Sequence, residues 1–430
     1  MHPTVAPYGP PEGEEEVAQA VDILSQSFAL SPDDVRKRLA LEGCHPRVLR
    51  EEGRVTASAS VIPMGQWFGG RRVEATGLGA VGVAPERRGL GSGRRLMEAV
   101  LRDERQRGAR LAVLYASSQA FYRRVGFEQA GSRVEHRVKL SGVDFQDRTL
   151  LLRPVREEDL PALREAYGRQ ARTQSGWLDR GPYAWRRALQ PLTETTHGFL
   201  VEGPSGVEGY VYLSRRQQPP SYQQELNLTD LVVLTPAAGR RLWTFLGDHR
   251  ALATEVLWRG GLTDPLLFLL AEQGYESKCL HRWMVRVLDV PAALQARGYP
   301  AGVSAALHLD VTDTLFPENG GRFVLEVSSE GETKQLSSEV LERGTAGCAV
   351  GRRPEGLRGP DAVPCDEALG QFFASAAHLE AASILAFLRR DRASTILCLA
   401  NLSPDERRYV GVLPQFGGRR VVNMLRDEPF

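Results

Sequence analysis

The chain contains 430 residues, of which 42% are hydrophobic and 25% charged, with 43 glycines and 26 prolines. This composition is typical of globular domains and excludes a collagen-like, coiled-coil or disordered chain. The 54 basic and 53 acidic residues leave a net charge of +1, which argues against a nucleic-acid-binding surface. The longest apolar run is too short to span a membrane, and residues 1–16 have a Pro/Gly-rich and then acidic composition unlike that of a signal peptide.

The cysteines and histidines are not arranged as in a disulfide framework or a metal site. The five cysteines are odd in number and widely spaced, without a Cys-x-x-Cys pair, and the eight histidines are scattered. These patterns predict reduced thiols, a cytoplasmic location and no bound metal. His136 lies on a strand-like run, and we expect it to be structural.

Residues 1–148 form the first of three predicted units. One helix is expected to start after Ser31, because Ser at the N-cap with Pro directly after it is a favoured pair. Apolar periodicity predicts the other helices at Glu14–Phe28, Arg94–Arg107 and Gln119–Val125. The same criterion predicts strands at Arg47–Arg50, Arg54–Ile62, Arg71–Val83, Arg110–Ala116 and Val134–Leu140.

Residues 149–290 and 291–430 are predicted as two further units. The second repeats the order of elements of the first, which indicates a duplication, and includes a strand at Leu228–Leu234 and a helix at Ala237–Leu252. The third contains predicted strands at Ala305–Val311, Gly321–Ser328 and Thr395–Ala400 and a helix at Glu367–Leu379. The predicted fold class is α/β (α+β), with mixed, mostly antiparallel sheets flanked by helices.

The strongest motif is a glycine-rich turn between a strand and a helix, Val81-Gly82-Val83-Ala84-Pro85-Glu86-Arg87-Arg88-Gly89-Leu90-Gly91-Ser92-Gly93. The backbone N–H groups of Gly89, Gly91, Ser92 and Gly93 can face a pyrophosphate, and the following helix adds the positive end of its dipole. Arg88, Arg94 or Arg95 can neutralise further phosphate charge. The alternative is a strand–turn–helix without a ligand.

Two common nucleotide motifs do not match this turn. No Gly-Lys-Ser/Thr follows, as a P-loop requires. No acidic residue stands on a strand about 20 residues further on, as a dinucleotide fingerprint requires. The turn resembles instead the acetyl-coenzyme-A (acetyl-CoA) motif of the GNAT acetyltransferases, whose Arg-x-x-Gly-x-Gly falls on Arg88, Gly91 and Gly93. The resemblance implies that Val81–Val83, splayed open at a β-bulge, binds the pantetheine arm.

A second motif supports the same resemblance. The run Phe121-Tyr122-Arg123-Arg124-Val125-Gly126-Phe127 follows a buried strand. In GNAT enzymes such a Phe-Tyr-x-x-x-Gly-Phe run lies beside the leaving coenzyme A sulfur, which implies that Tyr122 protonates that thiolate and that Ser117 contacts the cofactor. A phenol of pKa about 10 donates to a thiolate of pKa about 8.5 only over a short, aligned hydrogen bond. The alternative is a packed aromatic residue with a satisfied hydroxyl.

The three-unit layout resembles one branch of this superfamily, the Eis-like (enhanced intracellular survival) acetyltransferases. These have an active GNAT domain, a degenerate GNAT domain and a sterol-carrier-protein-like C-terminal domain. The resemblance implies a hexamer built as a dimer of trimers, and a catalytic terminal carboxylate, here Phe430. In the second unit Leu234–Leu242 occupies the position that corresponds to the glycine-rich turn but lacks a Gly-x-Gly sequence, so no second cofactor is expected there.

The acceptor pocket departs from the family. Phe28 matches an aromatic position of the pocket, but the neighbouring acidic position reads Ala29-Leu30, and a second aromatic position reads Ala80. An anionic cavity is expected to bind the substrate ammonium. The predicted function is acetyl transfer to a primary amine of a small polyamine-like or aminoglycoside-type acceptor by direct attack. The alternatives are a protein lysine acetyltransferase and a non-catalytic coenzyme A or lipid-binding module.

Overall fold

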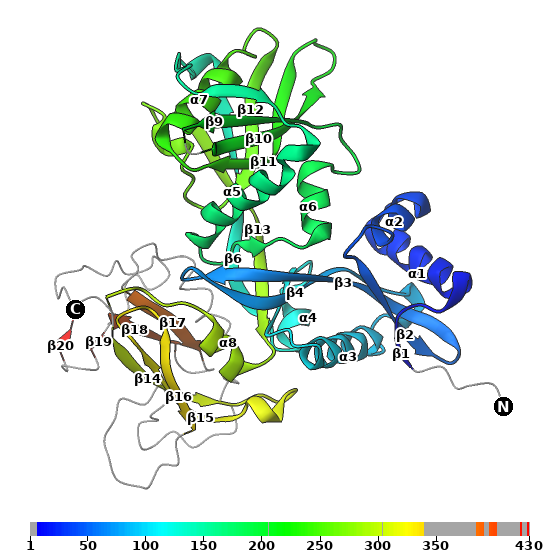
Figure 1. The fold of residues 1–430 in the computed structure, drawn as a ribbon. Helices are drawn as coiled ribbons and strands as arrows, with labels where there is room; N and C mark the ends of the chain where they lie inside the picture. The colour runs from blue at the N-terminus through cyan, green and yellow to red at the C-terminus, as the bar shows by residue number, and fades with distance from the viewer. Residues whose placement is uncertain are drawn as a thin grey trace.

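The computed structural model describes residues 7–204, 206–302 and 304–338, followed by four separate strand segments. These segments are β17 (Ile384–Arg390), β18 (Thr395–Asn401), β19 (Val422–Asn423) and β20 (Glu428–Pro429). The predicted helix Glu367–Leu379 and the terminal Phe430 lie outside the described residues. Three lobes surround the long strands β6 and β13 (Glu128–Lys139 and Tyr275–Val287), as Figure 1 shows.

The first lobe contains the elements that the N-terminal patterns predict. Its helices are α1 (Gly13–Phe28), α2 (Pro32–Leu39), α3 (Ser92–Gln106) and α4 (Gln119–Arg123). Its other strands are β1 (Tyr8–Gly9), β2 (His45–Glu51), β3 (Arg54–Phe68), β4 (Arg71–Val83) and β5 (Leu111–Tyr115). Ser31 caps α2, since its Oγ accepts a hydrogen bond from the Asp34 backbone N–H.

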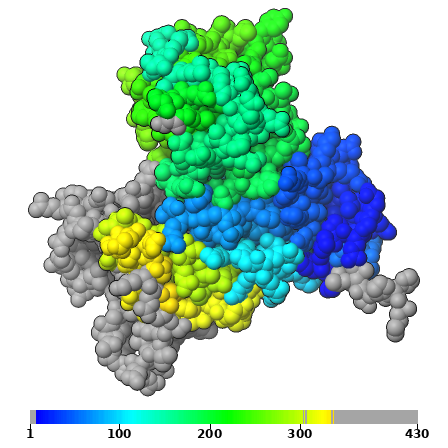
Figure 2. Space-filling view, in the orientation of Figure 1, coloured from blue at the N-terminus to red at the C-terminus, as the bar shows by residue number. Residues whose placement is uncertain are grey.

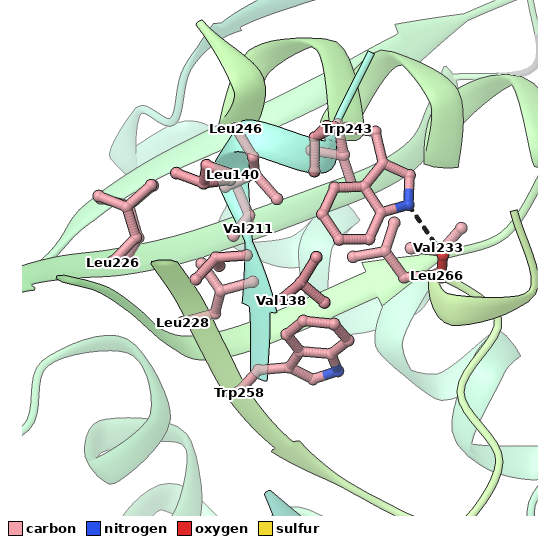
Figure 3. Packing of buried hydrophobic residues seen from close by; sticks show 14 of the residues in the cluster. Val138, Leu140, Val211, Leu226, Leu228, Val233, Trp243, Leu246, Trp258 and Leu266 are labelled. Carbon is pink, nitrogen blue, oxygen red and sulfur yellow. Dashed lines mark hydrogen bonds between the residues drawn. The ribbon is translucent and has the colours of Figure 1, made fainter. Parts of the chain in front are cut away.

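The second lobe repeats this alternation of strands and helices. Its helices are α5 (Leu160–Arg172), α6 (Pro182–Leu189) and α7 (Pro236–Gly247), the last ending five residues before the predicted Leu252. Its strands are β7 (Leu151–Pro154), β8 (Leu178–Asp179), β9 (His197–Gly203), β10 (Gly206–Gln217), β11 (Gln224–Val233) and β12 (Ala253–Gly260). Trp243 and Trp258 fill its core, where Trp243 Nε1 donates to the Leu266 carbonyl over 2.8 Å (Figure 3).

One continuous sheet joins these two lobes. Its strand order is β1-β2-β3-β4-β5-β13-β6-β12-β11-β10-β9-β7, and β8 pairs with β3. Only β4–β5 and β11–β12 are parallel pairs, which confirms the mixed, mostly antiparallel sheet expected from the sequence. Strand β13, which ends the second predicted unit, lies between β5 and β6 of the first. The lobes therefore share hydrogen-bonded strands.

The third lobe covers one face of the first part of this sheet. It contains α8 (Val290–Ala296), β14 (Ala305–Val311), β15 (Gly321–Val327) and β16 (Thr333–Ser338). Leu294 and Leu325 pack there against Phe68, Leu111 and Val285 in one buried cluster. The opposite face is covered by α3 and α4, whose apolar side chains form a separate cluster. Figure 2 shows this lobe in yellow beside the blue first lobe.

Among the described helices, none combines the length and the apolar character that a membrane crossing needs.

Candidate active site

A β-bulge opens the sheet at the predicted cofactor strand. The pairing of β3 with β4 shifts register between Ser58 and Ser60, because β4 contains one extra residue there. Ala80, at this point, has a φ of 46°, the left-handed backbone that a bulge uses. Strand β4 pairs with β5 only over Ala75–Gly77, and from Leu78 to Val83 no described strand pairs with the edge that faces β5. This edge can therefore bind an extended ligand.

The glycine-rich turn fits a pyrophosphate by its backbone geometry. Gly89 and Gly91 have φ of 79° and 89°, a region that other residues adopt only with strain. Helix α3 starts directly after them at Ser92, so its first N–H groups, which have no partner within the helix, border the turn. A Cβ added to Gly93 would lie 3.1 Å from Val83 Cγ2, so glycine permits the close approach of helix and strand.

Glu51, at the end of β2, holds the start of α3 in place. Its carboxylate accepts hydrogen bonds from Ser92 Oγ (2.7 Å), Thr56 Oγ1 (2.8 Å) and Arg95 Nε (2.8 Å). Partial burial raises the pKa of this carboxyl group, but the three hydrogen-bond donors outweigh that effect and lower it overall. No pattern in the sequence indicates a role for Glu51, because an acidic residue at a hairpin resembles any solvated turn. The Ser92 hydroxyl is occupied by this bond, which leaves the Ser92 backbone N–H for the cofactor.

The three candidate phosphate-binding arginines have different partners. Arg94 Nε donates to Glu98 over 2.7 Å, and Arg95 binds Glu51. Arg88 is exposed, and its Nε donates to the Val83 carbonyl over 3.4 Å. Of the three, Arg88 alone has no carboxylate partner within the described residues, so it is the one free to bind phosphate.

Tyr122 lies next to the cofactor strand, in the cluster that includes Val81 and Val83. Its side chain is only 6% exposed and packs edge-on against Phe121 and Phe127. Burial raises the pKa of its phenol to about 12. The hydroxyl makes no hydrogen bond to any described residue, so it is free to donate to a ligand. Ser117 is exposed in the loop between β5 and α4.

A cavity of about 1480 Å³ lies where the three lobes meet. Leu78 and Gly79 beside the bulge and Tyr115 at the end of β5 line it, so it reaches the opening of the sheet. Leu307 and Leu325 of the third lobe form part of its wall. The predicted pocket residues Phe28 and Ala80 are not among the residues that line it: Ala80 packs against the α1–α2 cluster, and Phe28 is 44% exposed at the end of α1.

The described lining of this cavity is rich in arginine. Seven arginines line it, against three acidic residues, Asp230, Glu330 and Glu332. The anionic acceptor cavity was expected beside Phe28 and the Phe430 carboxylate, which are not part of this lining, so it stays a prediction. The sequence could not locate the cavity, because its lining comes from segments between Ile62 and Glu332 that no local pattern connects.

Two other expectations concern metals and the second lobe. His136 is buried between Ser277 Oγ (2.8 Å) and the Gly261 carbonyl (2.9 Å), which confirms a structural role. Within the described ranges, no three His, Cys, Asp or Glu side chains are grouped as metal ligands. Helix α7 starts at a Thr235 cap without a glycine turn, and the absence of a second cofactor stays a prediction.

Comparison with known proteins agrees with this geometry. Two acetyltransferase (GNAT) domain families match residues 11–130 and 176–287, and a sterol carrier protein domain family matches residues 290–363. An uncharacterized N-acetyltransferase of Streptomyces griseus is 30% identical over 287 residues, which cover 61% of this chain and 68% of that protein.

Two solved structures are similar as well. The GCN5-related N-acetyltransferase of Anabaena variabilis has a TM-score of 0.72 and 34% identity, over 77% of this chain and 85% of that one. Eis1 of Mycobacterium abscessus has a TM-score of 0.62 and 23% identity, over 78% and 86% of the respective chains. The second likeness concerns the fold alone.

Proposed function

This chain belongs to the GNAT N-acetyltransferases, with the Eis-like arrangement of two GNAT domains before a sterol carrier domain, and we propose that it acetylates a primary amine by direct attack on acetyl-CoA. The observation that carries the proposal is the bulge at Ala80, which leaves the edge of β4 unpaired beside both the glycine turn and Tyr122. We propose residues 1–148, 149–290 and 291–430 as the three domains.

The cofactor side is assigned to the first lobe. Acetyl-CoA, when bound, supplies the thioester whose acetyl group is transferred. The backbone of Val81 and Val83 binds the pantetheine arm, while Gly89, Gly91, Ser92 and Gly93 offer N–H groups to the pyrophosphate. Arg88 adds a positive charge, and Ser117 borders the same opening from the loop after β5. No metal is part of this proposal.

The reaction needs a free amine, a polarised carbonyl and a proton for the leaving sulfur. A backbone N–H near Val83 polarises the carbonyl oxygen. Tyr122 gives its proton to the sulfur, and its high pKa keeps that proton in place at neutral pH. The Phe430 carboxylate, which lies outside the described residues, is proposed to accept the proton of the amine. Alignment of amine and thioester supplies much of the acceleration.

The acceptor is proposed to enter through the cavity, which reaches the opening of the sheet at Leu78 and Gly79. Sequence analysis expected a polyamine-like or aminoglycoside-type amine, with a protein lysine or a coenzyme A or lipid-binding role as alternatives. The arginine-rich lining weighs against a polycation. The cytoplasmic location and the hexameric dimer of trimers stay proposals.

The test is thiol release from acetyl-CoA across a panel of amines. We expect turnover by the wild type, a loss of about 100-fold or more in kcat for Tyr122→Phe and for a chain that lacks Phe430, and no change for the exposed control Tyr222→Phe. Calorimetry should detect acetyl-CoA binding by all four proteins. Absence of acetyl-CoA binding by the wild type, or equal kcat for Tyr122→Phe and Tyr222→Phe, would refute the proposal.

A further inference from the structure

Three of the arginines that line the cavity have no acidic partner among the described residues. Arg133 projects from β6, Arg172 ends α5, and Arg187 lies on α6; all three are exposed. None has a carboxylate of the described residues within ion-pair distance, in contrast to Arg71, which pairs with Glu332 over 2.8 Å. The described part of the cavity wall therefore carries positive charge that no described acid balances.

Each of these guanidinium groups lies over an aromatic ring. Arg172 lies 5.0 Å from the ring centre of Trp67, and Arg133 and Arg187 lie 5.9 Å from those of Tyr115 and Tyr183 respectively. A ring beneath a guanidinium restrains its position while N–H donors in the plane stay available. In Arg187 one donor, Nη1, is already used by the Tyr183 hydroxyl at 3.3 Å, and the other donors remain. That arrangement suits a planar carboxylate or a phosphate, which accepts two parallel hydrogen bonds.

The acidic residues of the same wall do not cancel this charge. Asp230 receives two hydrogen bonds from Arg180, at 2.6 and 2.8 Å, and one from Tyr210 at 2.9 Å. Glu332 is held by Arg71. Glu330 is the third acid, and its side chain accepts a bond from Ser329 Oγ. Each of the three described acids of the wall already accepts a hydrogen bond, whereas three guanidinium groups have no described carboxylate partner. The described wall therefore favours an anion over an ammonium group.

We propose that the acceptor is an amine that also carries an anionic group, a carboxylate or a phosphate, which the cavity binds through Arg133, Arg172 and Arg187. The inference rests on the proposed function and names the substrate class of the same site. Arg133 makes the main contact, because its partner ring belongs to Tyr115, two residues after the last β5 residue that pairs with β4. The positive wall also favours the neutral form of the amine, which is the form that attacks.

Matched acceptors test this inference. Tyrosine and tyramine differ by one carboxylate, O-phosphoethanolamine and ethanolamine differ by one phosphate, and spermidine represents the polycations. We expect kcat/KM to be about tenfold or more higher for at least one member with an anionic group than for its partner without that group, which corresponds to one charged hydrogen bond. The pair that shows this preference identifies the anion as carboxylate or phosphate.

Variants connect the preference to the arginines. Arg133→Gln should remove most of the preference, Arg172→Gln and Arg187→Gln should reduce it, and Arg186→Gln should leave it unchanged. Arg186 is the matched control, since it is exposed on the same helix as Arg187 but does not line the cavity. A preference for spermidine or for the partners without an anionic group, or an anion preference that survives all three substitutions, would overturn the inference and leave the proposed function intact.

If the enzyme turns over no amine of the panel, a direct binding measurement tests the inference. Calorimetry with the acetylated products N-acetyltyrosine and N-acetyltyramine then replaces the kinetic comparison. Tighter binding of N-acetyltyrosine by the wild type, lost in Arg133→Gln, supports the inference, and equal or absent binding of both overturns it. A separate titration with acetyl-CoA reports on the proposed function, so the two failures stay distinguishable.

Discussion

Substitution of Glu51 by Gln tests whether the geometry of the glycine turn depends on a residue that does not touch the ligand. In the wild type, the Glu51 carboxylate joins β2 to the first turn of α3 through Ser92 and Arg95. A glutamine keeps one acceptor oxygen but loses the charge, so the bonds from Ser92 and Arg95 cannot both be kept at full strength. The N–H groups that border the turn would then lose their fixed orientation.

The expected loss of acetyl-CoA binding free energy equals the contribution of about one charge-assisted hydrogen bond. Such a bond contributes roughly 1.5–3 kcal/mol, and the lower limit applies because the Glu51 side chain is 18% exposed and partly screened. About 1.5 kcal/mol corresponds to a roughly tenfold weaker Kd for acetyl-CoA. The lowered pKa of Glu51 also makes its contribution to folding stability depend on pH: this contribution is complete above the unfolded value of about 4.3 and is lost as the pH falls through the folded value.

Calorimetric titration with acetyl-CoA provides the measurement, and Glu98→Gln provides the control. Glu98 also binds an arginine of α3, Arg94, but its pair is a surface one, expected to contribute at most about 0.5 kcal/mol. We therefore expect a tenfold increase in Kd for Glu51→Gln and none for Glu98→Gln. Equal dissociation constants of the two variants for acetyl-CoA would show that Glu51 does not position the glycine-rich turn.

Three further predictions concern the buried ion pair between β13 and the third lobe, the proposed proton donor Tyr122, and the contact between α3 and β4. Asp313→Asn should lower the free energy of unfolding in urea by about 3 kcal/mol or more, because it removes the buried carboxylate charge that accepts two hydrogen bonds from Arg286, whereas the exposed Asp310→Asn should cost under 1 kcal/mol. Ultraviolet titration should find Tyr122 still protonated at pH 10, where an ordinary phenol is half ionised; a tyrosinate signal there that Tyr122→Phe removes would contradict the raised pKa. Gly93→Ala should destabilise the fold by about 1–3 kcal/mol, since its Cβ would meet Val83 at 3.1 Å; an unchanged urea midpoint would contradict this packing.

The geometry of the glycine-rich turn could be predicted from the sequence because its determinants are local, whereas cofactor binding by the turn stays a prediction. Positive φ at Gly89 and Gly91 demands glycine whatever surrounds the turn, and the motif places those glycines within three residues. Tyr122 follows from a run of seven residues in the same way, although its role stays a prediction. The Ser31 cap is local too, and the structure confirms it.

The features that could not be predicted depend on contacts between distant segments. Glu51 meets Ser92 across 41 positions of the chain, and no pattern in either segment indicates the other. Strand β13 begins with polar and exposed residues and ends with buried ones, and nothing in its sequence indicates that it lies between β5 and β6. Strand pairing of this kind is decided by burial of both faces and by register, which a single sequence does not display.

The inserted strand also explains why the cavity can be built from three lobes without a hinge between the two GNAT units. Because β6 pairs with β13 on one edge and with β12 on the other, ladder hydrogen bonds cross the junction of the lobes. Arg133 on β6 is therefore fixed relative to Tyr115 on β5 through β13. The continuous ladder thus fixes this guanidinium relative to the Tyr115 ring at the end of β5, which gives the positive charge of the wall a defined position relative to the unpaired edge of β4.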